Sequence, residues 1–135
     1  MLAKENRFSG QKQVKFVLAR GQHKASSLLS VNLFRPHGDN QDLKFAIIVS
    51  KKVAKKAVIR NKIRRRIYSA IQSQLEVFKP PIHAVFIVKN RDILDLDFAE
   101  LQQIILLLSH QANEAFEKFG LSKTKPHNKN RPKKQ

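Results

Sequence analysis

The segment Lys51–Tyr68, KKVAKKAVIRNKIRRRIY, constrains the fold more than any other part of the sequence. On a helix, Ile59, Ile63 and Ile67 would recur every fourth residue and form one apolar stripe. Nine of the remaining positions are Lys or Arg, and no acidic residue offsets them. Such a helix must bury its stripe against a neighbouring layer and leave its charge in solvent. We therefore predict a helix over about 56–78, ended by the Pro-Pro pair that follows it.

Three apolar segments flank this helix and predict strands at 27–34, 44–50 and 82–89. The residues at 36–40, PHGDN, have turn chemistry, so we interpret the first two strands as a hairpin. The tetrapeptide QHKA at 22–25 is a candidate for a further short strand. Because the predicted helix joins two strands, it would form a crossover if they are parallel.

Two more helices complete the pattern. Ser9 could cap a helix that runs through Arg20, and Asp97 with Glu100 forms a D-x-x-E capping box that opens a helix to about Phe119. The predicted order is α-β-β-β-α-β-α. This order indicates an α+β fold, a single-domain α/β sandwich with one small mixed sheet and a crossover basic helix, like the folds of some ribosomal proteins.

Charge composition indicates a polyanionic partner. Lys and Arg number 27 against 10 Asp and Glu, which gives a formal net charge of +17. Nucleic acid is the first candidate for that partner and an anionic membrane surface the second.

The 135 residues suit one domain over 1–122, followed by a disordered basic tail over 123–135. The absence of cysteine excludes a disulfide scaffold and a Cys-ligated zinc site. No apolar run approaches the roughly 20 residues that span a bilayer, and no signal peptide is visible, so we expect a cytoplasmic protein.

The cationic face of the central helix has two interpretations. It could be a solvated, solubilising face, but like-charge pairs such as Lys56–Arg60 and Arg60–Arg64 each destabilise a helix by ~0.2–0.5 kcal/mol. The alternative is that phosphates bind this face, because the Arg fork binds phosphate bidentately. Asn61 adds a donor and an acceptor. Arg60 and Arg65 project away from the isoleucines, so we expect neither to be needed for packing. We favour the phosphate interpretation.

The order of residues adds a resemblance. SKKVAKKAVIRNKIRRRI resembles the signature of the bacterial ribonuclease P protein subunit, in which a strand ends in S-K-K and a helix carries R-N-x-hydrophobic-basic-R. The matching residues here are Ser50-Lys51-Lys52 and Arg60-Asn61-Lys62-Ile63-Arg64-Arg65. The resemblance extends over roughly 6–111. Two positions depart from the pattern: Lys62, where Arg is commoner, and Tyr68, where a basic residue is common. We interpret Tyr68 as a packing residue, with base stacking as the alternative.

The resemblance implies a function in which RNA performs the chemistry. Members of this family are the accessory protein subunit of a ribonucleoprotein endoribonuclease that removes the 5′ leader from precursor tRNA. The expected partners are the catalytic RNA and that leader, with no membrane and no further protein required. Mg²⁺ is expected on the RNA, and no catalytic residue, metal ligand or cofactor is expected in the protein. The residues expected to contact the catalytic RNA are Lys51, Lys52, Lys55, Lys56, Arg60, Asn61, Lys62, Arg64 and Arg65.

The resemblance also implies a cleft for the leader between the first helix and the sheet, where aromatic rings stack on bases. The helix positions that are commonly Phe in the family correspond to Val14 and Leu18, and a strand position that is often aromatic corresponds to Asn32. Phe16 and Phe34 lie nearby in the sequence, although Phe16 could equally belong to the core. These five residues are the predicted leader cleft, which would depend on apolar contact and phosphate pairing more than on stacking.

Other patterns are weighed against simpler explanations. The acidic cluster at 92–100 could hold Mg²⁺ for a protein nuclease, but we favour turn and helix-cap chemistry. The five histidines show no metal-ligand spacing, and His83 is interpreted as an exposed strand residue.

Three rival functions are a ribosomal or other structural RNA-binding protein, a DNA-reading helix and a membrane-surface helix. The R-N core argues against a ribosomal or other structural RNA-binding protein. The nearly all-cationic helix argues against a DNA-reading helix. The lack of Trp and Phe beside the isoleucines argues against a membrane-surface helix.

Overall fold

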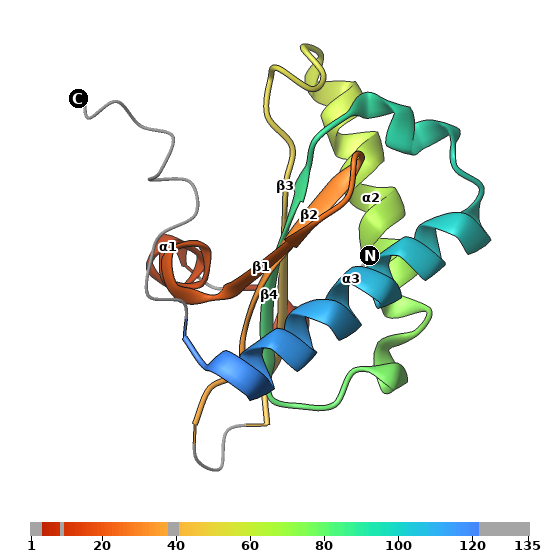
Figure 1. The fold of residues 1–135 in the computed structure, drawn as a ribbon. Coiled ribbons are helices and arrows are strands. Elements are labelled where there is room, and N and C mark those ends of the chain that lie inside the picture. Colours follow the sequence, from red (N-terminus) through yellow and green to blue (C-terminus); the bar gives the residue numbers. More distant parts are fainter. Residues whose placement is uncertain (1–3, 9, 38–40, 122–135) are drawn as a thin grey trace.

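One four-stranded sheet separates the helices into two layers in a computed structural model, which describes residues 4–8, 10–37 and 41–121 (Figure 1). Helix α1 lies on one face of the sheet, and α2 and α3 lie on the other. This arrangement confirms the predicted α+β fold and the order of its elements. The main elements are α1 (Gln11–Arg20), β1 (Gln22–Ala25), β2 (Leu29–Phe34), β3 (Leu43–Ile48), α2 (Ala57–Gln72), β4 (Ile82–Val88) and α3 (Phe98–Phe119).

The strand order is β1-β2-β4-β3. The pairs β1–β2 and β2–β4 are antiparallel, and β3–β4 is parallel, so α2 is the crossover between β3 and β4. The predicted hairpin between the segments 27–34 and 44–50 is wrong, because β4 lies between them. Six of the seven residues of β4 are buried, which is the pattern of a central strand. The tight hairpin is instead β1–β2, where the backbone N–H of Ser26 donates to the carbonyl of Leu29 (2.8 Å).

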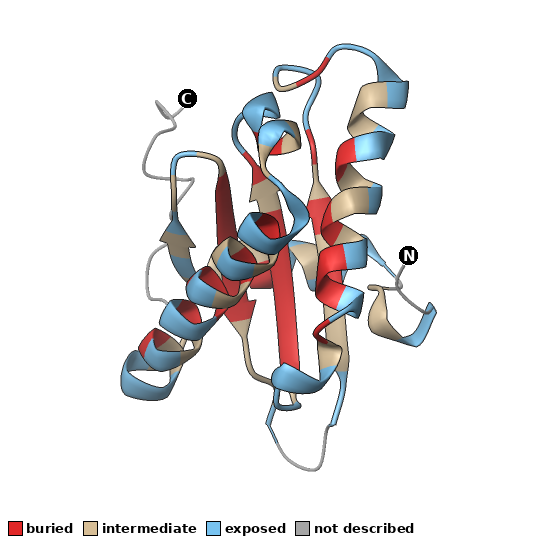
Figure 2. Cartoon of the chain, turned by 90° about the vertical axis from the view of Figure 1, so that its right-hand side faces the viewer, coloured by how far each residue is buried: buried red, intermediate tan, exposed pale blue. Residues whose placement is uncertain are grey.

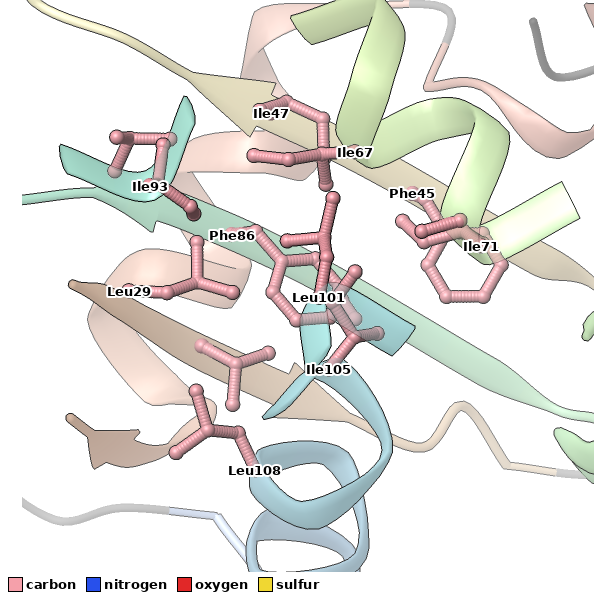
Figure 3. Close-up of a cluster of buried hydrophobic side chains, with 14 of the residues drawn as sticks. Leu29, Phe45, Ile47, Ile67, Ile71, Phe86, Ile93, Leu101, Ile105 and Leu108 are labelled. Carbon is pink, nitrogen blue, oxygen red and sulfur yellow. The ribbon is translucent and has the colours of Figure 1, made fainter. Parts of the chain in front are cut away.

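The main core lies between the sheet and the two helices α2 and α3 (Figure 2). Alternate residues of β2 and β4, among them Leu29 and Phe86, point toward these helices, while Ile67 and Leu101 point back toward the sheet (Figure 3). All four side chains are at most 1 % exposed. The alternation along each strand therefore leaves the opposite sheet face to α1.

Helix α2 ends at Gln72, six residues before the predicted end. A short 3₁₀ turn, η2 (Leu75–Val77), follows and changes the direction of the chain. That change lets Phe78 enter the core, where its ring meets Phe45 edge to face at 5.1 Å between centroids. A continuous helix would carry Phe78 away from this position, so packing overrides helical periodicity here.

The ends of α1 and α3 differ in how well sequence predicts them. The Asp97 carboxylate accepts from the Glu100 backbone N–H (2.8 Å), and the Glu100 carboxylate accepts from Asp97 N–H (3.0 Å), which confirms the capping box. Gly120 ends α3 with φ of 69°, a conformation that favours glycine. The predicted cap Ser9 lies outside the described residues, and Gly10 occupies the N-cap position of α1 without a side-chain hydrogen bond.

The N-terminal segment covers the outer edge of β3. After a 3₁₀ turn, η1 (Lys4–Asn6), Arg7 forms a parallel bridge with Phe45, and the Asn6 amide donates to the carbonyl of Leu43 (2.9 Å). This edge would otherwise present unpaired backbone groups. The predicted tail at 123–135 lies outside the described residues. Within the part of the chain that is described, no helix is long and apolar enough to cross a bilayer.

Candidate nucleic-acid interface

The cationic surface comprises the turn that follows β3 and the first half of α2. Two residues of the predicted stripe, Ile63 and Ile67, are fully buried, as is Ile71 one turn later, while Ile59 is half-buried and packs against the same core. These isoleucines hold one side of α2 against the sheet. The opposite side of the helix therefore faces solvent. We use the name "cationic surface" for the nine residues Lys51, Lys52, Lys55, Lys56, Arg60, Asn61, Lys62, Arg64 and Arg65.

Seven of these nine residues are exposed, and Arg60 and Arg64 are half-buried. No carboxylate in the described ranges forms an ion pair with any of them; the contacts between acidic and basic side chains found there join Asp42 to His83 and Glu114 to His110. Mutual repulsion within the surface is thus not relieved inside the folded domain. A polyanion that binds here would relieve it.

The expectation that Arg60 is not needed for packing is wrong. Its guanidinium Nη1 donates to the carbonyls of Ala54 (3.0 Å) and Lys55 (2.8 Å), and so ties the linker before α2 to the helix. Arg65 remains exposed, as expected. Arg64 Nη1 donates to the Asn61 side-chain oxygen (2.6 Å), which orders both groups toward solvent. The surface is therefore partly preorganised before any ligand arrives.

One further arginine of α2 is turned away from the cationic surface. Arg66 Nη1 donates to the carbonyl of Leu94 (3.3 Å), in the 3₁₀ turn η3 (Arg91–Asp95). This bond connects α2 to the segment after β4. Arg66 is thus a structural residue, in contrast to its neighbour Arg65.

A large cleft opens between α1, β3 and the start of the chain, on the sheet face opposite the main core. We call it the larger cleft; its volume is about 1210 Å³. Its lining combines apolar and aromatic side chains with four cations and one carboxylate. These residues are Lys4, Glu5, Arg7, Phe8, Gly10, Gln11, Val14, Lys15, Lys44, Phe45, Ala46, Ile48 and Tyr68.

The five residues predicted to form the leader cleft do not come together in one hollow. Val14 lines the larger cleft. Phe16 and Phe34 line a separate hollow of about 260 Å³ and contact each other edge to face, with 5.0 Å between ring centroids. Asn32 is only 3 % exposed, and its amide donates to the carbonyl of Leu18 (3.3 Å). Asn32 therefore anchors the end of α1 from beneath.

His83 is buried, so the interpretation of it as an exposed strand residue is wrong. The residue is 7 % exposed, and its imidazole meets the rings of Phe8 and Phe34 edge to face, at 5.4 and 6.0 Å between centroids. Its Nε2 lies 3.8 Å from the Asp42 carboxylate, beyond hydrogen-bond distance, and has no hydrogen-bond partner among the described residues. Burial lowers the pKa of His83, and the nearby Asp42 charge opposes that shift.

This burial predicts a loss of stability on mild acidification. Because the pKa of folded His83 lies below its unfolded value of 6.5, the unfolded chain takes up a proton first as pH falls through that value. The free energy of unfolding should therefore fall between about pH 7.5 and about pH 5.5, before most carboxylates titrate. Urea unfolding at both pH values should show this fall in the wild type and a smaller one in His83→Leu. If His110→Gln, which changes an exposed histidine, reduced it equally, His83 would not be its source.

Local hydrogen bonds account for two of the four carboxylates of the acidic cluster, those of Asp97 and Glu100. Asp97 and Glu100 cap α3, as described above, and the Asn90 side chain accepts from the backbone N–H of Asp92 (2.8 Å) at the start of η3. Among the described residues, no group of three or more His, Cys, Asp or Glu is placed to hold a metal ion. These contacts support the helix-cap interpretation.

The comparison with known protein families decides the assignment. The family model for Ribonuclease P matches residues 2–122, and so includes the cationic surface and the larger cleft. The chain belongs to the Ribonuclease P family. This family provides the protein component of ribonuclease P, a ribonucleoprotein endoribonuclease, and the resemblance found in the S-K-K and R-N residues is confirmed.

Two relatives and two solved structures agree with this assignment. The ribonuclease P protein component of Nostoc punctiforme is 30% identical over 107 residues, which cover 65% of this chain and 76% of the relative. The component of Picosynechococcus sp. is 34% identical over 89 residues, covering 65% and 74% respectively. The Staphylococcus aureus RNase P protein matches with a TM-score of 0.65 at 19% identity, covering 81% of this chain and 96% of that one. The Thermotoga maritima protein has the same score and identity, covering 76% and 93%. The two structures confirm the fold.

Sequence reasoning missed several residues of this ribonuclease P protein that line the larger cleft. Ala46 and Ile48 alternate with the core residues of β3, so the strand period itself could have placed them on the α1 face. Phe8 and Arg7 follow from the contact of the N-terminal segment with β3, for which the sequence carries no periodic signal. Tyr68 does pack against the core, as expected, and it also lines the cleft.

Proposed function

We propose that this ribonuclease P protein binds the catalytic RNA through the cationic surface. The observation that carries the proposal is the exposure of seven of its nine residues with no carboxylate pairing among the described residues. Arg and Lys in such a row neutralise phosphates and release counterions. Because the isoleucine stripe already holds α2 on the sheet, the opposite side of the helix is available to RNA along its first turns.

We further propose that the larger cleft receives the 5′ leader of precursor tRNA. A single strand needs a groove with cations for its phosphates and apolar or aromatic contacts for its bases. The cleft supplies Lys4, Arg7, Lys15 and Lys44 beside an apolar wall that includes Val14. Phe16 and Phe34 border the smaller hollow on the other flank of α1, and they would meet only a strand that continues past the helix.

In this proposal the protein positions RNA and the catalytic RNA performs the hydrolysis. Mg²⁺ held by that RNA would supply the activated nucleophile and stabilise the leaving oxygen. The protein contributes cations that offset phosphate repulsion between the two RNAs, an effect that matters most when Mg²⁺ is scarce. We expect this assembly in the cytoplasm and expect it to need no second protein.

The alternative of a DNA-reading helix fits α2 less well. A recognition helix reads base edges with its exposed side chains, in particular with Asn, Gln and Arg that are free to approach them. Here the Asn61 oxygen is occupied by Arg64, and Arg60 is bonded to the preceding linker. The remaining exposed side chains on this face are mostly Lys, which suits phosphate contact.

A reconstituted cleavage assay tests the proposal. The purified protein should not cleave precursor tRNA, whereas the protein with a bacterial ribonuclease P RNA should cleave it at a Mg²⁺ concentration at which the RNA alone is slow. Failure to stimulate that RNA, together with equal binding to unrelated structured RNA, would favour a general RNA-binding protein. If the RNA-free protein cleaved precursor tRNA, and if Asp95→Ala and Asp97→Ala abolished that cleavage, the proposal would be overturned.

A further inference from the structure

Tyr68 lies where the cationic surface meets the larger cleft. It is on α2, one turn after Arg64, and its side chain packs against the core with one part while another part lines the cleft. Arg7 of the N-terminal segment lines the same cleft, and the positive charges of Arg7 and Arg64 act to lower the pKa of the Tyr68 hydroxyl, against the larger effect of burial. A strand of RNA that leaves the cationic surface for the cleft would pass this residue.

The ring of Tyr68 differs from the other aromatic rings in the cleft lining. Phe8 is in edge-to-face contact with His83, and Phe45 with Phe78. Across the described ranges, Tyr68 makes no such ring contact, although it is the one tyrosine of the chain. No other ring in the described structure therefore contacts Tyr68, which is half-buried and lines the cleft.

The chemistry around Tyr68 suits a nucleotide. Burial raises the pKa of its hydroxyl, while a backbone hydrogen bond at Ile47 and the two arginines act in the opposite direction. The side chain therefore stays neutral at physiological pH and brings no negative charge toward a phosphate. Arg7 and Arg64 flank it with positive charge, so a base placed on the ring would have its phosphates beside cations.

Resting on the proposed function of the larger cleft, we infer that Tyr68 is the residue on which one base of the single-stranded leader stacks. Stacking is sequence-tolerant because every base has a π-face, so Tyr68 would recognise the presence of a base at one leader position and not its identity. It would supply an aromatic contact that the aliphatic residues Val14 and Leu18 on α1 cannot make. A basic side chain at the same place would contact phosphate only.

The test uses the reconstituted protein–RNA complex and precursor tRNAs with leaders that carry a single abasic nucleotide at each position in turn. Tyr68→Phe keeps the aromatic ring. Tyr68→Leu removes the ring but keeps an apolar side chain that can pack against the core. In the wild type, one abasic position should weaken substrate binding by roughly tenfold, as expected for one base–aromatic stack. Tyr68→Phe should behave likewise. Tyr68→Leu should bind the intact leader roughly tenfold more weakly and lose its sensitivity to that abasic position.

Each outcome separates this inference from the function on which it rests. Tyr68→Leu should leave the affinity for the catalytic RNA, and for a substrate whose leader is one nucleotide long, unchanged. If Tyr68→Leu retained the wild-type abasic profile, the inference would be wrong while leader binding stood. If Tyr68→Leu weakened catalytic-RNA binding instead, Tyr68 would belong to the cationic surface. If wild-type complexes bound long and one-nucleotide leaders equally, the leader cleft itself would be wrong.

Discussion

Replacing Lys62 and Arg65 together with Ala should weaken binding of the catalytic RNA by at least a hundredfold and leave the fold intact. Both side chains are exposed on α2. Each substitution removes a charge-assisted contact worth about 1.5–3 kcal/mol, and about 1.4 kcal/mol corresponds to a tenfold change in affinity. Stability should hold or rise slightly, because Ala favours a helix and the Lys62–Arg66 repulsion is removed. Titrations at several salt concentrations should also show a slope lowered by roughly 0.7–0.9 per lost phosphate contact.

The matched control removes the same charge elsewhere. Lys79 and Lys118 are exposed and lie outside α2, after its C-terminal turn and near the end of α3. Lys79→Ala with Lys118→Ala should lower affinity only slightly and leave the melting temperature unchanged. Equal losses in the two double variants would mean that total charge, and not the cationic surface, determines binding. A Lys62/Arg65 variant that unfolds would show that this face is structural.

The second large effect is on folding. Ile63 is fully buried between α2 and the sheet, so Ile63→Ala should reduce the free energy of unfolding by ~2–5 kcal/mol through lost burial and a residual cavity. That is a large share of the ~5–15 kcal/mol by which a domain is stable. Urea unfolding should report it as a lower midpoint at an unchanged slope.

Val58 offers a control within the same helix. Its side chain is 65% exposed, so Val58→Ala deletes a similar amount of side chain from a position that does not pack. The change in stability should stay within about 0.5 kcal/mol. If Val58→Ala destabilised the protein as much as Ile63→Ala, the isoleucine stripe would not be what holds α2 on the sheet.

Features that depend on local chemistry could be predicted from the sequence. The four-residue recurrence of isoleucine placed the buried side of α2, and the D-x-x-E pattern placed the start of α3. Both follow from short-range periodicity or from a hydrogen bond that spans three residues. The exposure of most of the cationic surface followed from the same helical geometry, because the isoleucines leave the opposite side to solvent.

Features that depend on long-range pairing could not be predicted from the sequence. The position of β4 between β2 and β3 depends on pairing between residues 49 to 59 apart for β2–β4 and 39 apart for β3–β4. The turn residues at 36–40 suggested a hairpin instead. The burial of His83 depends on Phe8 and Asp42, and the structural role of Arg60 on carbonyls of the linker. A cleft between the first helix and the sheet was expected, but most residues that line the larger cleft were missed for the same reason, since its walls come from three separate parts of the chain.

The measurement that tests the central claim most directly is where the catalytic RNA lies on this protein. The chain contains no cysteine, so Lys62→Cys provides a unique attachment point for a hydroxyl-radical reagent, and Lys118→Cys a matched one on α3. With the reagent at position 62, we predict localised cleavage of the catalytic RNA in the complex; at position 118, cleavage should be weak or absent. Strong cleavage from position 118 and none from position 62 would contradict the assignment of the cationic surface.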